Sequence, residues 1–260
     1  MRLYHNGMST CSQQVRLVLH EKNLAYDSTL LDLQKGEQFS PEYLVLNPAA
    51  VVPALEDQGE VLVESSLICA YLDDAYPEIA LLPGAPLDRY RMGLLIRRID
   101  EALAPACGVI TYAIGVRPVW FNQPADKVLA MLDKMPSPSR REARRAVFVE
   151  GVRAPAFKAA MLAYRDVLDL AEDALRKTQW LAGDTISRAD CALLPFVLRL
   201  VHLVQTQEIE SRPELQRWFA TMQARPAFTR AVSEWIPAPV VAGFAEAGSA
   251  VAAEIDEVMA

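Results

Sequence analysis

The chain has 260 residues, hydrophobic side chains at 52% of its positions and a formal net charge of −7. This length allows one large or two modest domains with an ample core, and the acidic balance argues against nucleic acid as the main partner. No apolar run reaches the roughly 20 residues that a membrane-spanning helix needs, so a membrane protein is not expected either.

The N-terminus indicates a cytoplasmic location, and the cysteines indicate neither disulfides nor a zinc site. From Met1 the sequence enters a strand pattern at once, without the apolar region of a signal peptide. The four cysteines lie far apart and include no Cys-x-x-Cys pair, so neither a disulfide framework nor a zinc site is expected. The three histidines have no metal-ligand spacing, and we predict no metal site.

The first 77 residues alternate between short strand and short helix patterns. Strands are predicted at residues 2–5, 26–33, 53–56 and 61–63, and helices at 13–22, 41–46 and 65–76. The last two strands flank Asp57-Gln58-Gly59, which is a hairpin signal. The predicted order is therefore β-α-β-α-β-β-α, a small α/β domain over residues 1–77.

The rest of the chain is predicted to be helical. Residues 78–87 are rich in proline and glycine, which is typical of a linker between domains. A helical domain follows at 88–260, with helices expected at about 88–114, 139–177, 187–206, 213–224 and 226–234. Prolines interrupt the pattern between Gly115 and Pro138, and we assign an insertion at about 115–150. The Ala-rich tail after Pro239 is expected to be helical or partly disordered.

Three side chains between the first strand and the first helix could act on a thiol. Ser9, Cys11 and Ser12 would lie at a helix N-terminus, where hydrogen-bond donors stabilise a thiolate and lower a thiol pKa from about 8.5. The simpler alternative is that Ser9 or Ser12 caps the helix and that Cys11 packs as a small core residue. We favour a function at this corner because a second binding signal follows it along the chain.

The second signal is Val51-Val52-Pro53, followed by Glu64-Ser65 at the start of a helix. Proline in a strand lacks the N–H that the ladder needs, and it therefore often marks a functional edge. If the Val52–Pro53 bond is cis, the N–H and C=O of Val52 are free to pair with the backbone of a ligand. The free N–H groups of the helix that begins at Ser65 favour a carboxylate. Glu64-Ser65 alone would be an ordinary helix start, but together with the proline it predicts a site for a peptide-like ligand.

The corner and the proline segment together resemble the glutathione site of the glutathione S-transferase family. The resemblance runs from the N-terminus to about residue 237. It implies a glutathione S-transferase fold, with an N-terminal thioredoxin-like α/β domain and a C-terminal all-α helical-bundle domain. It also implies that glutathione is the co-substrate and that the protein is a homodimer.

The resemblance assigns a part of glutathione to each predicted binding residue. Val52, beside Pro53, would pair its backbone with the cysteinyl part. Glu64 and Ser65 would hold the γ-glutamyl end, and Gln38 lies where the family often offers a polar side chain to the glycyl end.

At the corner, the Ser-x-Cys-Ser spacing resembles zeta-type isomerases and glutathione-dependent reductive dehalogenases. In those families the corner serine polarises the glutathione thiolate, and in some of them the cysteine forms a mixed disulfide with glutathione. We rank Ser12 and Cys11 together as the residue that contacts the thiol, with Ser9 just behind.

The helical half resembles a different branch. Residues 109–118, which would line the site for the electrophile, are similar to stretches of the bacterial glutathione-dependent β-etherases and of the reductive dehalogenases. Residues 135–155 are similar to an insertion of the β-etherases. Tyr112 and Trp120 could stack on an aromatic substrate, although aromatic residues at helical spacing are more often part of the core.

Two other patterns in the helical half are assigned to structure and to solvent. Ser187 and Asp190 form a capping box before an apolar run, which we assign to folding. Four arginines share one predicted helix face: Arg140, Arg141, Arg144 and Arg145. They could attract anionic ligands, but a solvated face balanced by neighbouring glutamates is the preferred interpretation.

The expected function is glutathione S-transferase chemistry. The enzyme would lower the pKa of the glutathione thiol and aim the thiolate at an electrophilic carbon of a small hydrophobic or aromatic compound. Displacement of a β-aryloxy group, that is, β-aryl ether cleavage, is the preferred reaction. A maleylacetoacetate-type isomerase, a reductive dehalogenase and a non-catalytic protein that binds glutathione or apolar ligands remain open.

Overall fold

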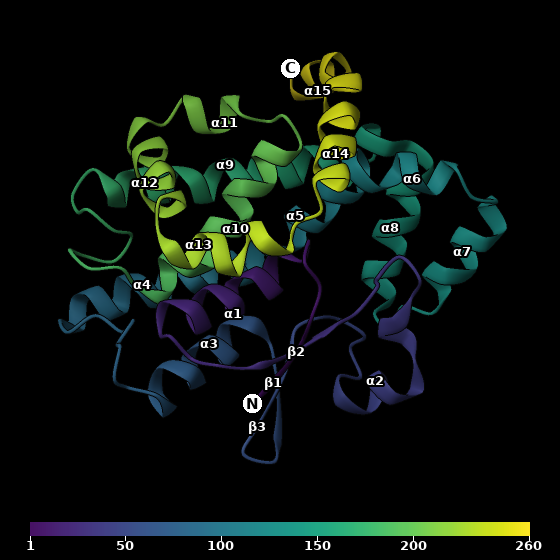
Figure 1. Ribbon diagram of the computed structural model, residues 1–260. Coiled ribbons are helices and arrows are strands. Elements are labelled where there is room, and N and C mark those ends of the chain that lie inside the picture. The colour runs from purple at the N-terminus through teal and green to yellow at the C-terminus, as the bar shows by residue number, and fades with distance from the viewer.

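In the computed structural model, which describes residues 1–260, a small sheet near the N-terminus is joined to a larger body of helices (Figure 1). The strands are β1 (Arg2–His5), β2 (Asp27–Leu30), β3 (Ala54–Asp57) and β4 (Glu60–Val63). Their order is β2-β1-β3-β4, with β1 parallel to β2 and β3 antiparallel to both β1 and β4. This confirms the predicted thioredoxin-like domain.

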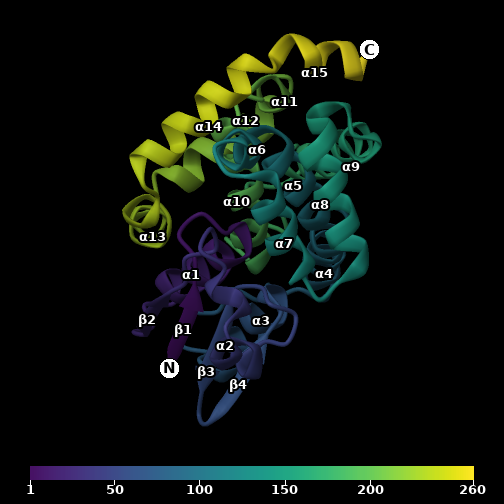
Figure 2. The ribbon, with the colours of Figure 1, turned by 90° about the vertical axis from the view of Figure 1, so that its right-hand side faces the viewer.

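Three helices complete the N-terminal domain: α1 (Thr10–Glu21), α2 (Pro41–Leu46) and α3 (Ser65–Ala75), with a short 3-10 turn, η1 (Glu37–Phe39), before α2. Helices α1 and α3 pack against each other and against α10 (Arg188–His202), so they lie between the sheet and the helical body (Figure 2). The loop before α1 therefore opens where the two halves of the molecule meet.

The helical body begins with a nearly continuous run over Pro86–Phe121. It consists of α4 (Pro86–Arg98), α5 (Ala104–Thr111) and α6 (Arg117–Phe121), joined by the π-helical turns η2 (Ile99–Leu103) and η3 (Tyr112–Val116). The later elements are α7 (Ala125–Asp133), α8 (Pro138–Glu150), η4 (Gly151–Arg153), α9 (Pro155–Leu175), α11 (Gln207–Glu210), α12 (Pro213–Gln223), α13 (Pro226–Ala231), η5 (Ser233–Trp235), α14 (Ala238–Ala250) and α15 (Ala252–Met259). The all-α domain is thus confirmed.

Two predictions about the helices were wrong. The helix predicted over 139–177 is broken between α8 and α9, because Gly151 adopts a left-handed φ of 61° and Pro155 then starts a new helix. The segment 115–138, predicted as an interruption, contains α6 and α7, because its prolines fall at helix starts. The tail after Pro239 is helical.

Helix α10 is the centre of the helical body, and almost all of its side chains are buried. The predicted capping box is present at its N-terminus, between Ser187 and Asp190. The fully buried Asp190 carboxylate also accepts hydrogen bonds from the backbone N–H of Leu181 at 3.0 Å and from Nε1 of Trp218 at 2.8 Å. This carboxylate therefore ties three segments of the helical body together.

The run Pro86–Phe121 is long and apolar enough to cross a membrane by length and composition alone. Of its most apolar window, 44% is buried inside the protein, where it packs against α9 and α10. This is weak evidence for a membrane span, because a buried core helix of a soluble protein can be equally long and apolar.

Candidate functional site

The corner between β1 and α1 is a short loop that ends in a helix cap. Ser9 is the N-cap of α1, and its Oγ accepts a hydrogen bond from the Ser12 N–H at 3.2 Å. Ser12 is fully buried, with its Oγ 3.4 Å from the Asn6 N–H, whereas Ser9 is partly exposed. Of the two serines, only Ser9 reaches the surface of the corner, and its hydroxyl proton is free to be donated.

The Cys11 thiol lies between the corner and α3, beside the Ser65 side chain. Part of the Cys11 residue is exposed, but the sulfur is surrounded by protein. This burial raises the pKa of Cys11 to about 11, and a hydrogen bond from Ser65 offsets only part of the effect. Burial therefore favours the neutral thiol of Cys11 over the thiolate that a nucleophile needs.

Arg16 of α1, a fully buried arginine, holds the corner loop from within the N-terminal domain. Its guanidinium donates hydrogen bonds to the carbonyls of Asn6 and Gly7, both at 3.1 Å. It also donates to the carbonyl of Ala231 in α13, at 2.6 Å. Arg16 thereby fixes the loop relative to the C-terminal segment of the chain.

Arg199 of α10 holds the same loop from the helical side. It is 5% exposed and donates to the Met8 carbonyl and, at 3.0 Å, to Oγ1 of Thr111. Sequence reasoning missed both Arg16 and Arg199, because a single arginine within an apolar helix gives no local sign of what it contacts.

His5 of β1 shares the buried network below the corner. Its Nδ1 lies 2.9 Å from Nη1 of Arg16, and its Nε2 lies 2.7 Å from Oγ of Ser28. Because a guanidinium can only donate, Nδ1 accepts and the single ring proton is on Nε2. Burial and the Arg16 charge lower the pKa of His5 to about 3.

The free energy of unfolding should therefore decrease as the pH falls from about 6.5. In the unfolded chain His5 binds a proton below its ordinary pKa of 6.5, but in the folded chain it does so only near 3. Between these values the unfolded state holds more protons, at up to about 1.4 kcal/mol per pH unit. His202, whose pKa burial lowers to about 4, acts in the same direction.

Urea unfolding at pH 7 and pH 5 would measure this effect. We expect a smaller loss of stability between the two pH values in His5→Gln than in the parent chain, because glutamine does not titrate. Protonation of carboxylates contributes equally to both chains and cancels in the comparison. An identical pH dependence in the two proteins would contradict this assignment.

The segment before β3 presents a free pair of backbone groups. The Val52–Pro53 peptide bond is cis, and neither the N–H nor the C=O of Val52 has a hydrogen-bond partner in the chain. The neighbouring Val51 carbonyl, in contrast, accepts from the Tyr43 hydroxyl at 2.6 Å and from Nδ2 of Asn47 at 2.9 Å. Since backbone groups away from water are nearly always paired, the Val52 pair is available to a ligand.

The N-terminus of α3 is open beside the corner. No side chain caps it, so the first N–H groups of the helix have no partner from a cap. Glu64, at the N-cap position, has a φ of 67°, a conformation that L residues adopt at a cost of about 1–3 kcal/mol and that is common at ligand sites. Because Ser65 adjoins Cys11, the structure brings the corner and the start of α3 together.

Gln38 of η1 forms no hydrogen bond with the other predicted site residues. Its Nε2 lies 3.5 Å from the Leu33 carbonyl, while its Oε1 is buried without a partner. An unpaired buried polar atom is costly, so Gln38 is a candidate for contact with a bound molecule.

The wall of the site on the helical side contains one of the two predicted aromatic residues. Tyr112 is partly exposed, and its ring centroid lies 5.0 Å from that of Trp120. Trp120 is 4% exposed and packs with Val128, Leu132 and Phe148, so it belongs to a small core cluster.

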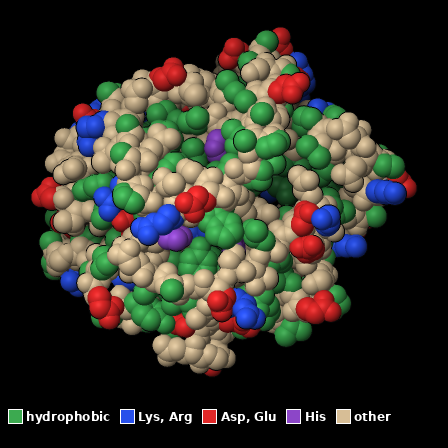
Figure 3. All heavy atoms as spheres, viewed as in Figure 1, with side chains coloured by type: hydrophobic (Ala, Val, Ile, Leu, Met, Phe, Trp, Pro, Cys, Tyr) green, Lys and Arg blue, Asp and Glu red, His purple; other side chains and the backbone are tan.

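The molecular surface is hollowed between α14 and α8, next to the corner loop (Figure 3).

The four arginines that begin at Arg140 were predicted to form a solvated helix face, and this prediction was wrong for Arg144. Arg140 and Arg145 are exposed, as expected of a solvated face. Arg144 is only 9% exposed, and its guanidinium carbon lies 3.8 Å from the centre of the Tyr112 ring. The helix turns this residue inward because α8 packs against η3 and α5.

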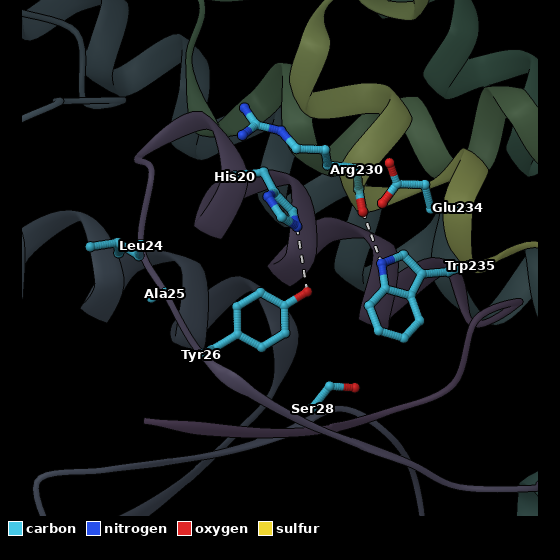
Figure 4. A pocket seen from close by; sticks show the side chains of 8 residues that line it. All are labelled: His20, Leu24, Ala25, Tyr26, Ser28, Arg230, Glu234 and Trp235. Carbon is cyan, nitrogen blue, oxygen red and sulfur yellow. Dashed lines mark hydrogen bonds between the residues drawn. The ribbon is translucent and has the colours of Figure 1, made fainter.

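A separate pocket of about 330 Å³ lies outside the predicted site (Figure 4). It is formed by the end of α1, the strand β2 and the segment from α13 to η5. Its lining residues are His20, Leu24, Ala25, Tyr26, Ser28, Arg230, Glu234 and Trp235. None of them is a predicted site residue, and none has a buried polar side-chain atom that lacks a partner.

Comparisons with known proteins agree in naming one family. The model of the glutathione S-transferase N-terminal domain matches residues 8–75, and that of the C-terminal domain matches residues 129–226. Glutathione S-transferase F13 of Arabidopsis thaliana is 29% identical over 230 residues, which are 88% of this chain and 94% of that protein. A zeta-class glutathione S-transferase of Euphorbia esula is 45% identical over 83 residues, 32% of this chain and 37% of that protein.

Among solved structures, the beta-etherase LigF from Sphingobium sp. strain SYK-6 superposes with a TM-score of 0.79 at 25% identity. The superposition covers 90% of this chain and 98% of that one.

Proposed function

This chain belongs to the glutathione S-transferase family, whose co-substrate is glutathione, and we propose that it cleaves β-aryl ethers of aromatic compounds. The observation that carries the glutathione site is the free N–H and C=O pair of Val52 beside the uncapped start of α3. The likeness to the beta-etherase LigF over 90% of the chain favours the ether substrate.

In the proposed complex, three parts of the N-terminal domain bind glutathione. The Val52 backbone, next to Pro53, pairs with the cysteinyl unit as a neighbouring strand would. The open first turn of α3, with Glu64 and Ser65, binds the γ-glutamyl end, where a helix N-terminus favours the carboxylate. The unpaired Oε1 of Gln38 accepts a hydrogen bond near the glycyl end.

Ser9 is the proposed donor to the glutathione sulfur. Its Oγ already accepts from the Ser12 N–H, so its proton is available to a thiolate. A preorganised hydroxyl at a helix N-terminus favours the ionised thiol. Burial of Ser12 and the raised pKa of Cys11 make both of these less suitable, which reverses the order that we expected from the sequence.

The proposed reaction is a displacement at carbon. The glutathione thiol loses its proton, the sulfur forms a bond to the ether-bearing carbon, and the carbon–oxygen bond breaks. The electron pair of that bond leaves with the aryloxy oxygen, which is protonated to a phenol. The domains contribute mainly by holding sulfur and carbon in line at the hollow between α8 and α14.

A homodimer through α3 and α4 is part of the proposal. Four apolar side chains of these helices are strongly exposed: Leu67 (65%), Leu87 (57%), Tyr90 (65%) and Leu94 (44%). Large apolar side chains exposed together on adjacent helices are typical of a surface that a partner covers. A second copy of the chain is the partner that the family resemblance implies.

An isomerase that acts on a small acidic substrate is the second candidate. The 45% identity to a zeta-class transferase over 83 residues favours it. A reductive dehalogenase is less well supported, because it would use Cys11 as a nucleophile and the pKa of this thiol is raised to about 11.

The test is incubation of the protein with glutathione and a β-aryl ether ketone, with release of the phenol measured against a control without protein. We expect glutathione-dependent release well above the control. No release from a protein that binds glutathione normally would overturn the etherase proposal in favour of the isomerase. Binding without turnover of any electrophile would indicate a non-catalytic binding protein.

A further inference from the structure

Arg144 of α8 is a buried cation without an anionic partner. It is 9% exposed and makes no salt bridge, and its Nε is a buried donor without an acceptor. The polar side chain that interacts with its guanidinium is that of Tyr112. Its guanidinium packs on the face of the Tyr112 ring, with 3.8 Å between the guanidinium carbon and the centre of the ring. Buried charges are normally paired, so this one calls for an anion from outside the chain.

The other buried arginines of the protein differ from Arg144 in that their guanidinium groups have acceptors. Arg212, equally buried, pairs with Asp169 at 2.7 Å and with Glu208 at 3.5 Å. Arg16 is satisfied by backbone carbonyls instead. Arg199 has two acceptors but a third donor, Nε, that is also buried and free. Arg144 is the one buried arginine with neither a carboxylate nor a backbone carbonyl as an acceptor.

The position of Arg144 places its charge in the wall of the electrophile site. A Cβ at Gly108 of α5 would lie 2.5 Å from Nη2 of Arg144, so this glycine makes room for the guanidinium. The guanidinium also lies against the ring of Tyr112, which is partly exposed on the helical wall of the site.

We infer that Arg144 is a specificity-determining residue that binds an anionic group, such as a carboxylate, on the electrophilic substrate. The inference rests on the proposed transferase function and adds that the aromatic electrophile is an acid. A carboxylate would accept two parallel hydrogen bonds at the edge of the guanidinium, while the Tyr112 ring packs on the face of the guanidinium plane.

The glycyl carboxylate of glutathione has the same chemistry, but Arg144 is less well placed for it. The contacts of Arg144 are with α5 and η3, on the helical side of the site. The proposed glutathione contacts all come from the N-terminal domain. The experiment below separates the two sources.

The test compares conjugation of glutathione to chlorodinitrobenzoate and to its methyl ester, each divided by its uncatalysed rate. In the parent, kcat/KM for the acid should exceed that for the ester by about 10-fold or more. Arg144→Gln should lower kcat/KM for the acid by about 10- to 100-fold and for the ester by less than about 3-fold. Arg145→Gln, which changes an exposed arginine next to it, is the matched control and should alter neither.

A binding measurement makes the test independent of turnover. Calorimetry with dinitrobenzoate, in the presence of glutathione, should show binding that Arg144→Gln abolishes and Arg144→Lys partly restores. Gly108→Ala should weaken the same binding, because the added Cβ displaces the guanidinium.

Three results would overturn the inference. The first is an equal loss for the acid and the ester in Arg144→Gln, which indicates a structural role. The second is weaker glutathione binding in that variant with unchanged selectivity, which assigns Arg144 to the glycyl carboxylate. The third is dinitrobenzoate binding that Arg144→Gln leaves unchanged. If neither compound is conjugated although dinitrobenzoate binding depends on Arg144, aryl chlorides are not substrates and the anion site stands.

Discussion

Ser9→Ala should lower kcat/KM for glutathione conjugation by about 100- to 1,000-fold, while the affinity for glutathione changes little. The variant removes a corner hydroxyl that is partly exposed and free to donate. Glutathione would still bind through Val52 and the start of α3, but its sulfur would remain protonated at neutral pH. Steady-state kinetics with chlorodinitrobenzoate, together with calorimetry for glutathione, would measure the two effects separately.

Because Ser9 also caps α1, its loss destabilises the helix by about 0.5–2 kcal/mol. Ser137→Ala is the matched control, since Ser137 caps α8 in the same way, through the Arg140 N–H. Ser12→Ala tests the alternative that we ranked first from the sequence. A large loss of activity in Ser12→Ala with normal activity in Ser9→Ala would refute our assignment.

Asp190→Ala should destabilise the fold by about 3–5 kcal/mol, the largest effect on stability that we expect from a single substitution. The carboxylate is fully buried and accepts from the backbone N–H and hydroxyl of Ser187, both at 2.8 Å, as well as from Leu181 and Trp218. Its removal leaves these donors buried without an acceptor. Urea denaturation at neutral pH would measure the change in the free energy of unfolding.

Asp184→Ala provides the matched control for this effect. Asp184 is exposed in the same loop and makes no hydrogen bond, so its loss should change stability by no more than about 0.5 kcal/mol. Similar stabilities of the two variants would contradict the prediction that the hydrogen bonds of the Asp190 carboxylate hold the segments around α10 together.

The regular elements were largely predictable because their signals are local. Helix α2 lies where the pattern placed it, over Pro41–Leu46, since a serine cap and a proline define its start. Helix α1 begins at Thr10 and not at Gln13, because its start depends on the Ser9 cap and not on the apolar pattern. The break at Gly151 was missed because a glycine between two helical patterns does not by itself indicate a left-handed turn.

Much of the candidate site could not be predicted, because it depends on contacts between distant parts of the chain. Arg16 and Arg199 fix the corner loop from two domains, and no short motif contains both. The inward orientation of Arg144 depends on how α8 packs on α5 and η3, whereas its sequence neighbours are typical of a solvated face. The relative exposure of Ser9 and Ser12 is likewise set by packing.

The most direct test of thiol activation at the corner is a pH titration of glutathione bound to the protein, followed through the ultraviolet absorbance of its thiolate. We expect the pKa of bound glutathione to lie at least about one unit below the roughly 8.5 of a free thiol, and to return toward the free value in Ser9→Ala. If bound glutathione titrates like free glutathione, the corner does not activate the thiol, and the proposed chemistry is contradicted.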